Sequence, residues 1–281
     1  MSQQEITLGH SPDSDDAFMF YALARNKIDT CGYKFKHVLQ DIETLNQRAA
    51  LGELDITAIS VHAYAYVHDN YALLTAGGSM GDAYGPTVVA RDPMTLDELK
   101  QKTIAIPGKM TSAYLALRLC IGEFSFDIVP FDQIIPAVIH EKADAGLIIH
   151  EGQLLYDSYG LHKVLDLGEW WNDETEGLPL PLGANVIRKN LGRECISRIA
   201  PLMRETIEYS LEHRREALDY ALQYARDLPQ DSADRFVGMY VNELTLNLGE
   251  RGREAYRLFM ERGYSEGIIP RQVELEFIDC G

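Results

Sequence analysis

Hydrophobic and polar positions follow the same order in two stretches of the chain. From Thr44 to Tyr64, a helical spacing and a short turn precede Asp55 and an apolar run that ends at Ser60. From Gln133 to Leu154, a helical spacing and a turn again precede an aspartate and an apolar run, which continues into His150. Short apolar runs bounded by turn residues indicate buried strands. The repetition therefore predicts two helix–strand units of one design.

The remaining positions alternate or repeat over short stretches, which is typical of an α/β chain. Period-two alternation or short apolar runs predict strands at 5–9, 33–39, 71–80, 86–91, 103–106 and from residue 127. Helical spacing predicts helices at 15–27, 95–102 and 112–123, and it dominates the chain after residue 195. The segment 170–183 is rich in glycine and proline, so we expect it to be a loop.

Two extended segments, 86–91 and 184–188, lie on either side of the second repeated unit and predict crossings between two lobes. Residues 1–88 and 185–281 would form a discontinuous first lobe, and residues 89–184 a second lobe. The cleft between two lobes is the expected ligand site. We therefore expect the α/β, two-lobed architecture of the type II periplasmic binding proteins.

Strand ends in open α/β sheets are where ligands bind, so the ends of the repeated strands are candidate sites. Ala58, Ile59 and Ser60 end the first strand, and we expect them to contact a ligand, because no neighbouring base would make the serine a nucleophile. His150 ends the second strand and is a candidate general base, since imidazole titrates near pH ~6.5. The alternative is a histidine that only closes the strand. Glu151 faces the other way along a strand, so we expect it to be solvated.

A turn at Pro107-Gly108 precedes Thr111 and Ser112 at a predicted helix start. Their hydroxyls and the free N–H groups of a first helical turn form a natural cradle for a carboxylate. An ordinary N-cap is the alternative, and the same residues are able to serve both purposes. We expect His62 and His68 at the surface or at the edge of the core.

Three acidic residues, Asp13, Asp15 and Asp16, follow the first predicted strand. They lack the glycine and distal glutamate of a calcium loop, and no histidine spacing supports zinc, so no metal site is predicted. Helix capping is the expected role. His10 and Ser11 come just before them, and we expect both residues, with Asp13, to line the ligand cleft.

Length and composition fit this picture: 281 residues, 46% hydrophobic and 25% charged, are enough for two globular lobes. Cys31, Cys120, Cys195 and Cys280 lie far apart without metal or redox spacing, which indicates free thiols. No apolar run reaches about 18 residues, so no membrane span is predicted. The first residues lack the pattern of a secretory signal, and we expect a cytoplasmic protein.

The formal net charge is −17, and this excess of acid argues against a nucleic-acid partner, which requires a basic footprint. A small anionic ligand is compatible with it, because helix N-termini and a few local groups are able to hold one. The sequence makes no prediction of the oligomeric state.

Five segments occur in the order and register of a known family: SPDSDDAFMFYAL, DIETLN, ADAGLIIHEGQ, LPLGANVIRKNL and YVNELTLNLGERG. Together they extend from Ser11 to Gly252, and the chain resembles the 1,4-dihydroxy-6-naphthoate synthase family of the futalosine route to menaquinone. The resemblance implies the binding-protein fold in a cytoplasmic enzyme that uses no metal or organic cofactor.

The resemblance also implies a reaction. Cyclic dehypoxanthine futalosine is cleaved by a carbon–carbon lyase to release 1,4-dihydroxy-6-naphthoate from its sugar-derived part. A base takes a proton from a sugar hydroxyl, and the alkoxide collapses with bond cleavage and aromatisation. The histidine of the family's IIHE motif, which matches His150, is that base, and the substrate-contacting threonine pair matches Thr111 and Ser112. Asp13 and Asp15 stand where the family often has cysteine and asparagine, and Ala58 where lysine is common.

Other functions fit the same fold. A cytoplasmic binding protein for a small aromatic or carboxylate ligand would share the architecture, because fold does not fix function. A superfamily enzyme with an altered substrate is the second alternative, and the changes at Asp13 and Ala58 are compatible with it. Chorismate dehydratase is one such relative, and it lacks the SPxxDDAF opening.

Overall fold

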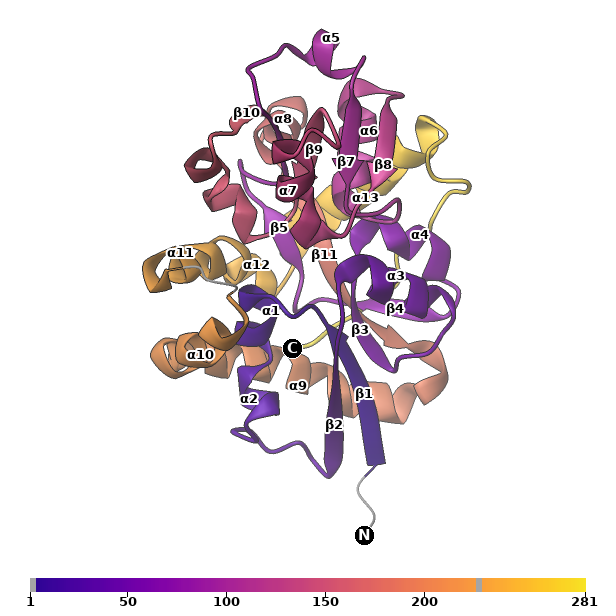
Figure 1. Ribbon diagram of the computed structural model, residues 1–281. Helices are drawn as coiled ribbons and strands as arrows, with labels where there is room; N and C mark the ends of the chain where they lie inside the picture. Colours follow the sequence, from indigo (N-terminus) through magenta and orange to yellow (C-terminus); the bar gives the residue numbers. More distant parts are fainter. Residues whose placement is uncertain (1–3, 226–228) are drawn as a thin grey trace.

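Two β-sheets organise the protein, and the computed structural model describes residues 4–225 and 229–281 (Figure 1). The first sheet contains β1 (Gln4–His10), β2 (Tyr33–Leu39), β3 (Ile56–Ser60), β4 (Tyr71–Leu74), β5 (Ser79–Gly81), β11 (Leu180–Arg188) and β12 (Phe277–Ile278). The second contains β6 (Thr87–Ala90), β7 (Thr103–Ile106), β8 (Ser125–Ile128), β9 (Ala145–Ile148) and β10 (His162–Asp166). The strand orders are β12-β4-β11-β3-β1-β2, with β5 beside β11, and β10-β6-β9-β7-β8.

Helices cover both sheets (Figure 1). They are α1 (Ser14–Met19), α2 (Tyr21–Ala24), α3 (Ile42–Ala50), α4 (Tyr64–Val67), α5 (Leu96–Leu99), α6 (Ser112–Ile121), α7 (Ile134–Ile139), α8 (Leu167–Glu174), α9 (Arg193–Glu212), α10 (Arg214–Ala221), α11 (Gln230–Tyr240), α12 (Glu243–Leu246) and α13 (Gly249–Ser265). Short 3₁₀ turns are η1 (Val61–Ala63), η2 (Phe131–Gln133), η3 (Glu151–Leu154), η4 (Tyr156–Tyr159), η5 (Lys189–Leu191) and η6 (Leu222–Tyr224). Over the described residues, no helix combines the length and the apolarity that crossing a membrane requires.

The two repeated units are confirmed as α3–β3 and α7–β9, and both strands are buried along their whole length. The aspartate that precedes each strand makes the same contact. Asp55 accepts the backbone N–H of Thr7 in the parallel neighbour β1 at 2.9 Å, and Asp144 accepts the N–H of Thr103 in the parallel neighbour β7 at 2.9 Å. The two units therefore share an aspartate hydrogen bond to the neighbouring strand as well as a hydrophobic pattern.

The prediction of a loop at 170–183 is wrong, because this segment contains most of α8 and the start of β11. The carboxylate of Asp166 begins α8 by accepting the N–H groups of Gly168 and Glu169. Trp171 is fully buried, and its ring meets Phe259 of α13 edge-on with 5.3 Å between the centroids. Packing against a helix far along the chain therefore outweighs the local glycine and proline content.

Three smaller differences concern element ends. The helix expected at 15–27 is divided into α1 and α2, and the strand expected at 71–80 into β4 and β5. The strand expected from residue 127 begins two residues earlier, as β8. None of these differences moves a candidate site residue to another element.

The two sheets are the cores of two lobes, and α13 contacts both. It packs on β11 of the first sheet and on α6, which follows β7 of the second sheet, and it lies beside both in Figure 1. Tyr256, Phe259 and Met260 of α13 belong to the same buried cluster as Leu117 and Trp171. The lobe boundaries at 88/89 and 184/185 stay a prediction, and residues 1–3 and 226–228 lie outside the described part of the chain.

Candidate active site

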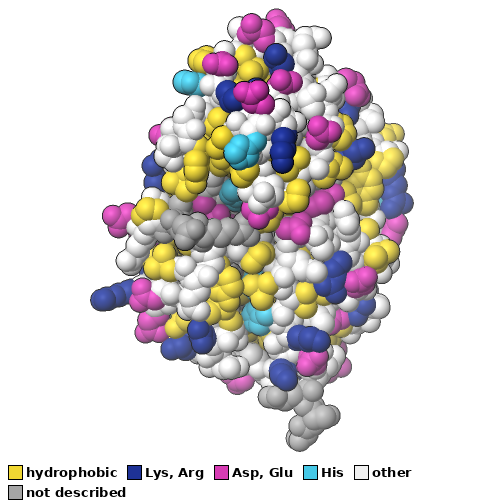
Figure 2. All heavy atoms as spheres, in the orientation of Figure 1, with side chains coloured by type: hydrophobic (Ala, Val, Ile, Leu, Met, Phe, Trp, Pro, Cys, Tyr) yellow, Lys and Arg dark blue, Asp and Glu magenta, His cyan; other side chains and the backbone are white. Residues whose placement is uncertain are grey.

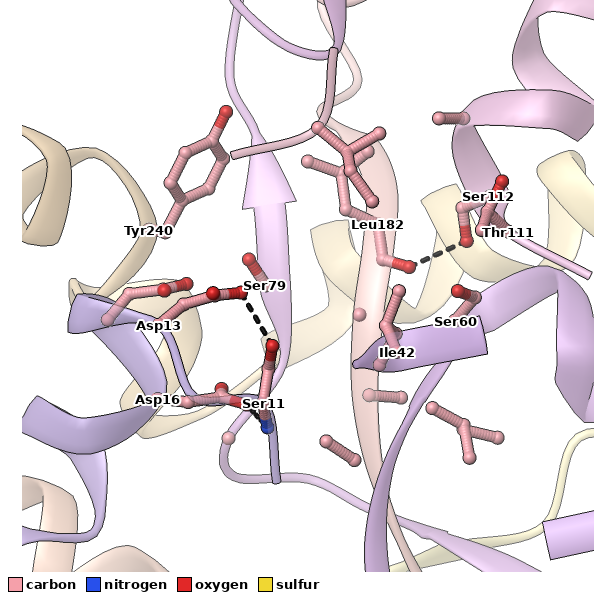
Figure 3. A pocket seen from close by; sticks show the side chains of 18 of the residues that line it. Ser11, Asp13, Asp16, Ile42, Ser60, Ser79, Thr111, Ser112, Leu182 and Tyr240 are labelled. Carbon is pink, nitrogen blue, oxygen red and sulfur yellow. Dashed lines mark hydrogen bonds between the residues drawn. The ribbon is translucent and has the colours of Figure 1, made fainter. Parts of the chain in front are cut away.

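A cavity of about 120 Å³ lies between the two sheets, and elements of both lobes form its wall. The predicted residues in this wall are Ser11, Asp13, Ala58, Ile59, Ser60, Thr111 and Ser112. His10 and His150 are not among the lining residues. Figure 3 shows Asp13 and Asp16 at one end and Ser60, Thr111 and Ser112 at the other. That these residues bind a ligand stays a prediction.

The wall of this cavity carries no positive charge, because none of its described lining residues is Lys, Arg or His. Figure 2 shows Lys and Arg interspersed with Asp and Glu over the face that it draws. An anion in the cavity would therefore be held by neutral donors, such as hydroxyls and the first turn of a helix, and not by an ion pair.

Thr111 is the N-cap of α6, as the sequence predicts. Its hydroxyl accepts the N–H of Tyr114 at 3.1 Å and donates to the carbonyl of Gly108 at 2.9 Å. The hydroxyl of Ser112 accepts the N–H of His62 at 3.2 Å and donates to the carbonyl of Leu182 at 2.6 Å. Both hydroxyls hold the start of α6 in place, and Ser112 and Ala113 of its first turn line the cavity.

His150 is not one of the residues that line the cavity, but the preceding residue, Ile149, is. Its Nδ1 accepts the N–H of Gly152 at 3.0 Å, so Nε2 carries the ring proton and donates to the carbonyl of Phe131 at 2.9 Å. Both ring nitrogens are therefore bound to backbone in this conformation. Acting as a base requires the ring to release the bond from Gly152.

The expectation that Glu151 is solvated is wrong, since its side chain is only 4% exposed. The strand ends at Ile148, so the alternation that this expectation used does not extend to Glu151. The carboxylate accepts the hydroxyl of Ser14 at 3.0 Å and the N–H of Ser14 at 3.4 Å. A buried side chain of the second lobe thereby binds the first turn of α1 in the first lobe.

Residues 11–16, which we call the opening loop, comprise the turn after β1 and the start of α1, and two of their aspartates bind one serine. Asp16 accepts the N–H of Ser11 and Asp13 accepts its hydroxyl, each at 2.6 Å. Asp13 is the N-cap residue of α1, but its carboxylate makes no capping hydrogen bond, and Asp15 and Asp16 lie in the first turn of the helix. Across residues 4–225 and 229–281, no group of three or more His, Cys, Asp or Glu side chains is placed to hold a metal ion.

Burial determines the protonation of this loop. It raises the pKa of Asp16 to about 7, and it raises the pKa of Asp15 well above its ordinary range, where neighbouring carboxylates add to the effect. Carboxyl groups that keep their proton near neutral pH are able to donate hydrogen bonds. The acidic end of the cavity is therefore less negative than its composition indicates.

The raised pKa of Asp16 predicts that the stability of the folded protein depends on pH. Native Asp16 keeps its proton up to about pH 7, whereas the unfolded chain loses it near pH ~4. The contribution of Asp16 to the free energy of unfolding is therefore fully present below about pH 4 and is lost as the pH rises through about 7. We expect Asp16→Asn to show a smaller fall in melting temperature than the wild type between pH 5 and 8, measured by circular dichroism. The exposed control Asp127→Asn should follow the wild type; equal slopes for wild type and Asp16→Asn would contradict the assignment.

Two histidines are more buried than the sequence indicates. His62, expected at the surface or core edge, is only 1% exposed, and its Nδ1 lies 3.3 Å from the carbonyl of Thr111. His10, expected in the cleft, lies 3.0 Å from His37 and 3.2 Å from the carbonyl of Ser11. Burial lowers the pKa of His62 to about 4 and of His10 to about 3, so both rings are neutral at physiological pH.

Several residues around the cavity were not predicted, and the clearest is Asn46, a fully buried side chain bound to Ser60. Tyr240 of α11 also lines the cavity, and its hydroxyl donates to Gln153 of the second lobe at 2.7 Å. The DIETLN segment contains Asn46, so this family motif includes a residue beside the cavity, but the motif gives no indication that Asn46 binds Ser60. Tyr240 had no comparable signal.

Comparisons with known proteins identify the family of this chain. A family model described as menaquinone biosynthesis matches residues 6–265. The 1,4-dihydroxy-6-naphthoate synthase of Thermus thermophilus is 42% identical over 259 residues, which cover 92% of this chain and 94% of the relative. A crystal structure of a protein from Archaeoglobus fulgidus is 46% identical with a TM-score of 0.90, and it covers 94% of this chain and 98% of its own.

A more distant structure shows the fold alone. The periplasmic aliphatic sulphonate binding protein of Escherichia coli is 11% identical with a TM-score of 0.68, and it covers 96% of this chain and 95% of its own. The protein thus has the two-lobed fold of the type II periplasmic binding proteins, with the cavity between its lobes. Together with the close relatives and the family model, which match nearly the whole chain, this shows that the chain belongs to the 1,4-dihydroxy-6-naphthoate synthase family of menaquinone biosynthesis.

Proposed function

We propose that this protein is a carbon–carbon lyase that converts cyclic dehypoxanthine futalosine to 1,4-dihydroxy-6-naphthoate in the cytoplasm. One observation supports the proposal: the cavity between the lobes brings together the strand end at Ser60, a predicted ligand contact, and the helix start at Thr111 and Ser112, which the family resemblance assigns to the substrate. The first turn of α6 is the expected partner of the substrate carboxylate.

The rest of the wall suits the other parts of such a substrate. Apolar side chains between the two polar ends provide a surface for an aromatic ring; they include Met19, Ile42, Ile59, Leu182 and Phe236. Protonated carboxyls of the opening loop are able to exchange hydrogen bonds with the hydroxyls of a sugar-derived part. An anionic aromatic ring system would therefore lie with its carboxylate toward α6.

His150 is the proposed base. Rotation of its ring away from Gly152 frees the Nδ1 lone pair, which takes a proton from a substrate hydroxyl. The oxygen then forms a carbonyl, the adjacent carbon–carbon bond breaks, and its electron pair enters the ring, which becomes aromatic. The proton returns to an oxygen of the product, so the reaction needs neither an oxidant nor a cofactor.

The direct test supplies purified protein with cyclic dehypoxanthine futalosine. We expect stoichiometric release of 1,4-dihydroxy-6-naphthoate, followed by absorbance and identified by mass spectrometry. Substitution of the exposed His162 by alanine should leave the rate unchanged. Absence of product from folded protein at any pH or protein concentration would reject the proposal.

One observation favours a second function. Because both nitrogens of His150 are bound to backbone, the structure also fits a protein that carries a small aromatic carboxylate without changing it. Such a protein would bind 1,4-dihydroxy-6-naphthoate in calorimetry and leave cyclic dehypoxanthine futalosine intact. A family member with an altered substrate would leave it intact as well, and would turn over a related compound.

A further inference from the structure

The hydroxyl groups of the cavity wall differ in whether their proton is free to be donated to a ligand. A hydroxyl has one proton, so a hydroxyl that already donates within the protein has none to donate to a ligand. Four lining hydroxyls are in this position: Ser11 donates to Asp13, Thr111 to Gly108, Ser112 to Leu182, and Tyr240 to Gln153. In this conformation none of the four has a hydroxyl proton to donate to a ligand.

Ser60 differs from these four hydroxyls, because its oxygen accepts a hydrogen bond within the protein while its proton is not donated there. The side-chain N–H of Asn46 donates to Ser60 Oγ at 3.1 Å, and the backbone N–H of Ser60 donates to Asn46 Oδ1 at 2.8 Å. The backbone bond fixes the orientation of the amide, since an N–H donates only to the amide oxygen. Among the described residues, no acceptor takes the hydroxyl proton of Ser60.

Asn46 is held tightly enough to impose this arrangement. Its side chain is fully buried, and the second hydrogen of Nδ2 faces Glu43 Oε2 at 3.5 Å. The same carboxylate oxygen accepts the N–H of Met110, in the turn before α6, at 3.3 Å. Ser79, in contrast, also lines the cavity but has no hydrogen-bond partner among the described residues that would fix its rotation.

We propose that Asn46 is a positioning residue that makes Ser60 an oriented hydroxyl donor of this site, with its proton directed at an anionic or carbonyl oxygen of the ligand. Figure 3 shows the Ser60 side chain beside Thr111 and Ser112, at the end of the cavity where the carboxylate is expected. The inference deepens the proposed function and rests on it for the identity of the ligand.

Asn46→Asp tests the inference with almost no change of shape. An ionised carboxylate still accepts the N–H of Ser60, but it has no N–H for Ser60 Oγ and takes the hydroxyl proton instead. We expect the Kd for 1,4-dihydroxy-6-naphthoate, measured by calorimetry at pH 8, to rise by about tenfold to a hundredfold, as in Ser60→Ala. At lower pH the introduced carboxylate takes up a proton and regains a donor, so the affinity of Asn46→Asp should recover while that of Ser60→Ala does not.

The double variant separates positioning from a merely structural role. If Asn46 acts through Ser60, Asn46→Asp combined with Ser60→Ala binds no more weakly than either single variant. Losses that multiply, or an Asn46→Asp protein with wild-type affinity at pH 8, would overturn the inference. The exposed Asn70→Asp adds the same charge as a control, and thermal unfolding of each variant verifies its folding.

The two proposals fail in different ways. Wild-type protein that binds 1,4-dihydroxy-6-naphthoate without turning over cyclic dehypoxanthine futalosine would reject the lyase and leave the role of Asn46 intact. Turnover by the wild type with multiplying losses in the double variant would reject the role of Asn46 alone. Folded wild-type protein that shows neither binding nor turnover would overturn both.

Discussion

Alanine in place of His150 should lower turnover of cyclic dehypoxanthine futalosine by about 10²- to 10⁴-fold, the usual contribution of a general base. The Kd for 1,4-dihydroxy-6-naphthoate should change by less than about tenfold, because His150 lies outside the cavity wall. Single-turnover kinetics measure the chemical step, and calorimetry measures the affinity. A fully active His150→Ala protein would exclude the histidine as the base.

A second variant separates chemistry from local structure. In the structure His150 donates to Phe131 and accepts from Gly152, so its removal also deletes two hydrogen bonds of the turn. Glutamine has a donor and an acceptor and no basic nitrogen. His150→Gln should therefore be as inactive as His150→Ala if the histidine is the base, and it should recover activity if the histidine only supports the turn.

Alanine in place of Trp171 should lower the free energy of unfolding by about 3–5 kcal/mol, the typical cost of deleting a buried aromatic side chain. Trp171 is fully buried, its indole N–H donates to the carbonyl of Pro179 at 3.2 Å, and its ring meets Phe259. The cavity left behind would lie between α8 and α13. Urea denaturation followed by circular dichroism gives the free energy.

The adjacent Trp170 is the matched control for this prediction. It is only partly buried and packs at the edge of the same cluster, so Trp170→Ala should cost clearly less. Equal losses for the two variants, or a loss below about 1 kcal/mol for Trp171→Ala, would contradict the role assigned to the buried ring.

Local patterns predicted most of the architecture. The repeated units have a clear hydrophobic period, an aspartate at one position and turn residues between helix and strand, and each of these signals acts over a few residues. Thr111 was predictable as the cap of α6 for the same reason. A two-lobed architecture followed from the presence of two such units, and the two sheets agree with it.

Contacts between distant segments were not predictable in this way. Trp171 is buried by α13, and Glu151 is buried by the start of α1, so neither environment is visible in the neighbouring sequence. His62 is buried by the second lobe's Thr111 and Ser112. The partners of His150 depend on how the turn after β9 closes, and hydrophobic spacing carries no information about that.

The position of α13 also has a consequence for the order in which the protein folds during synthesis. The ribosome completes α6, α8 and the whole second sheet well before it produces Tyr256, Phe259 and Met260. Until those side chains emerge, the apolar residues of the second lobe that contact α13 lack their partners, and uncovered apolar surface of this kind favours association between partly folded chains. The last long helix of the chain therefore closes the second lobe as well as the first, and a nascent chain that stops short of it leaves both unfinished.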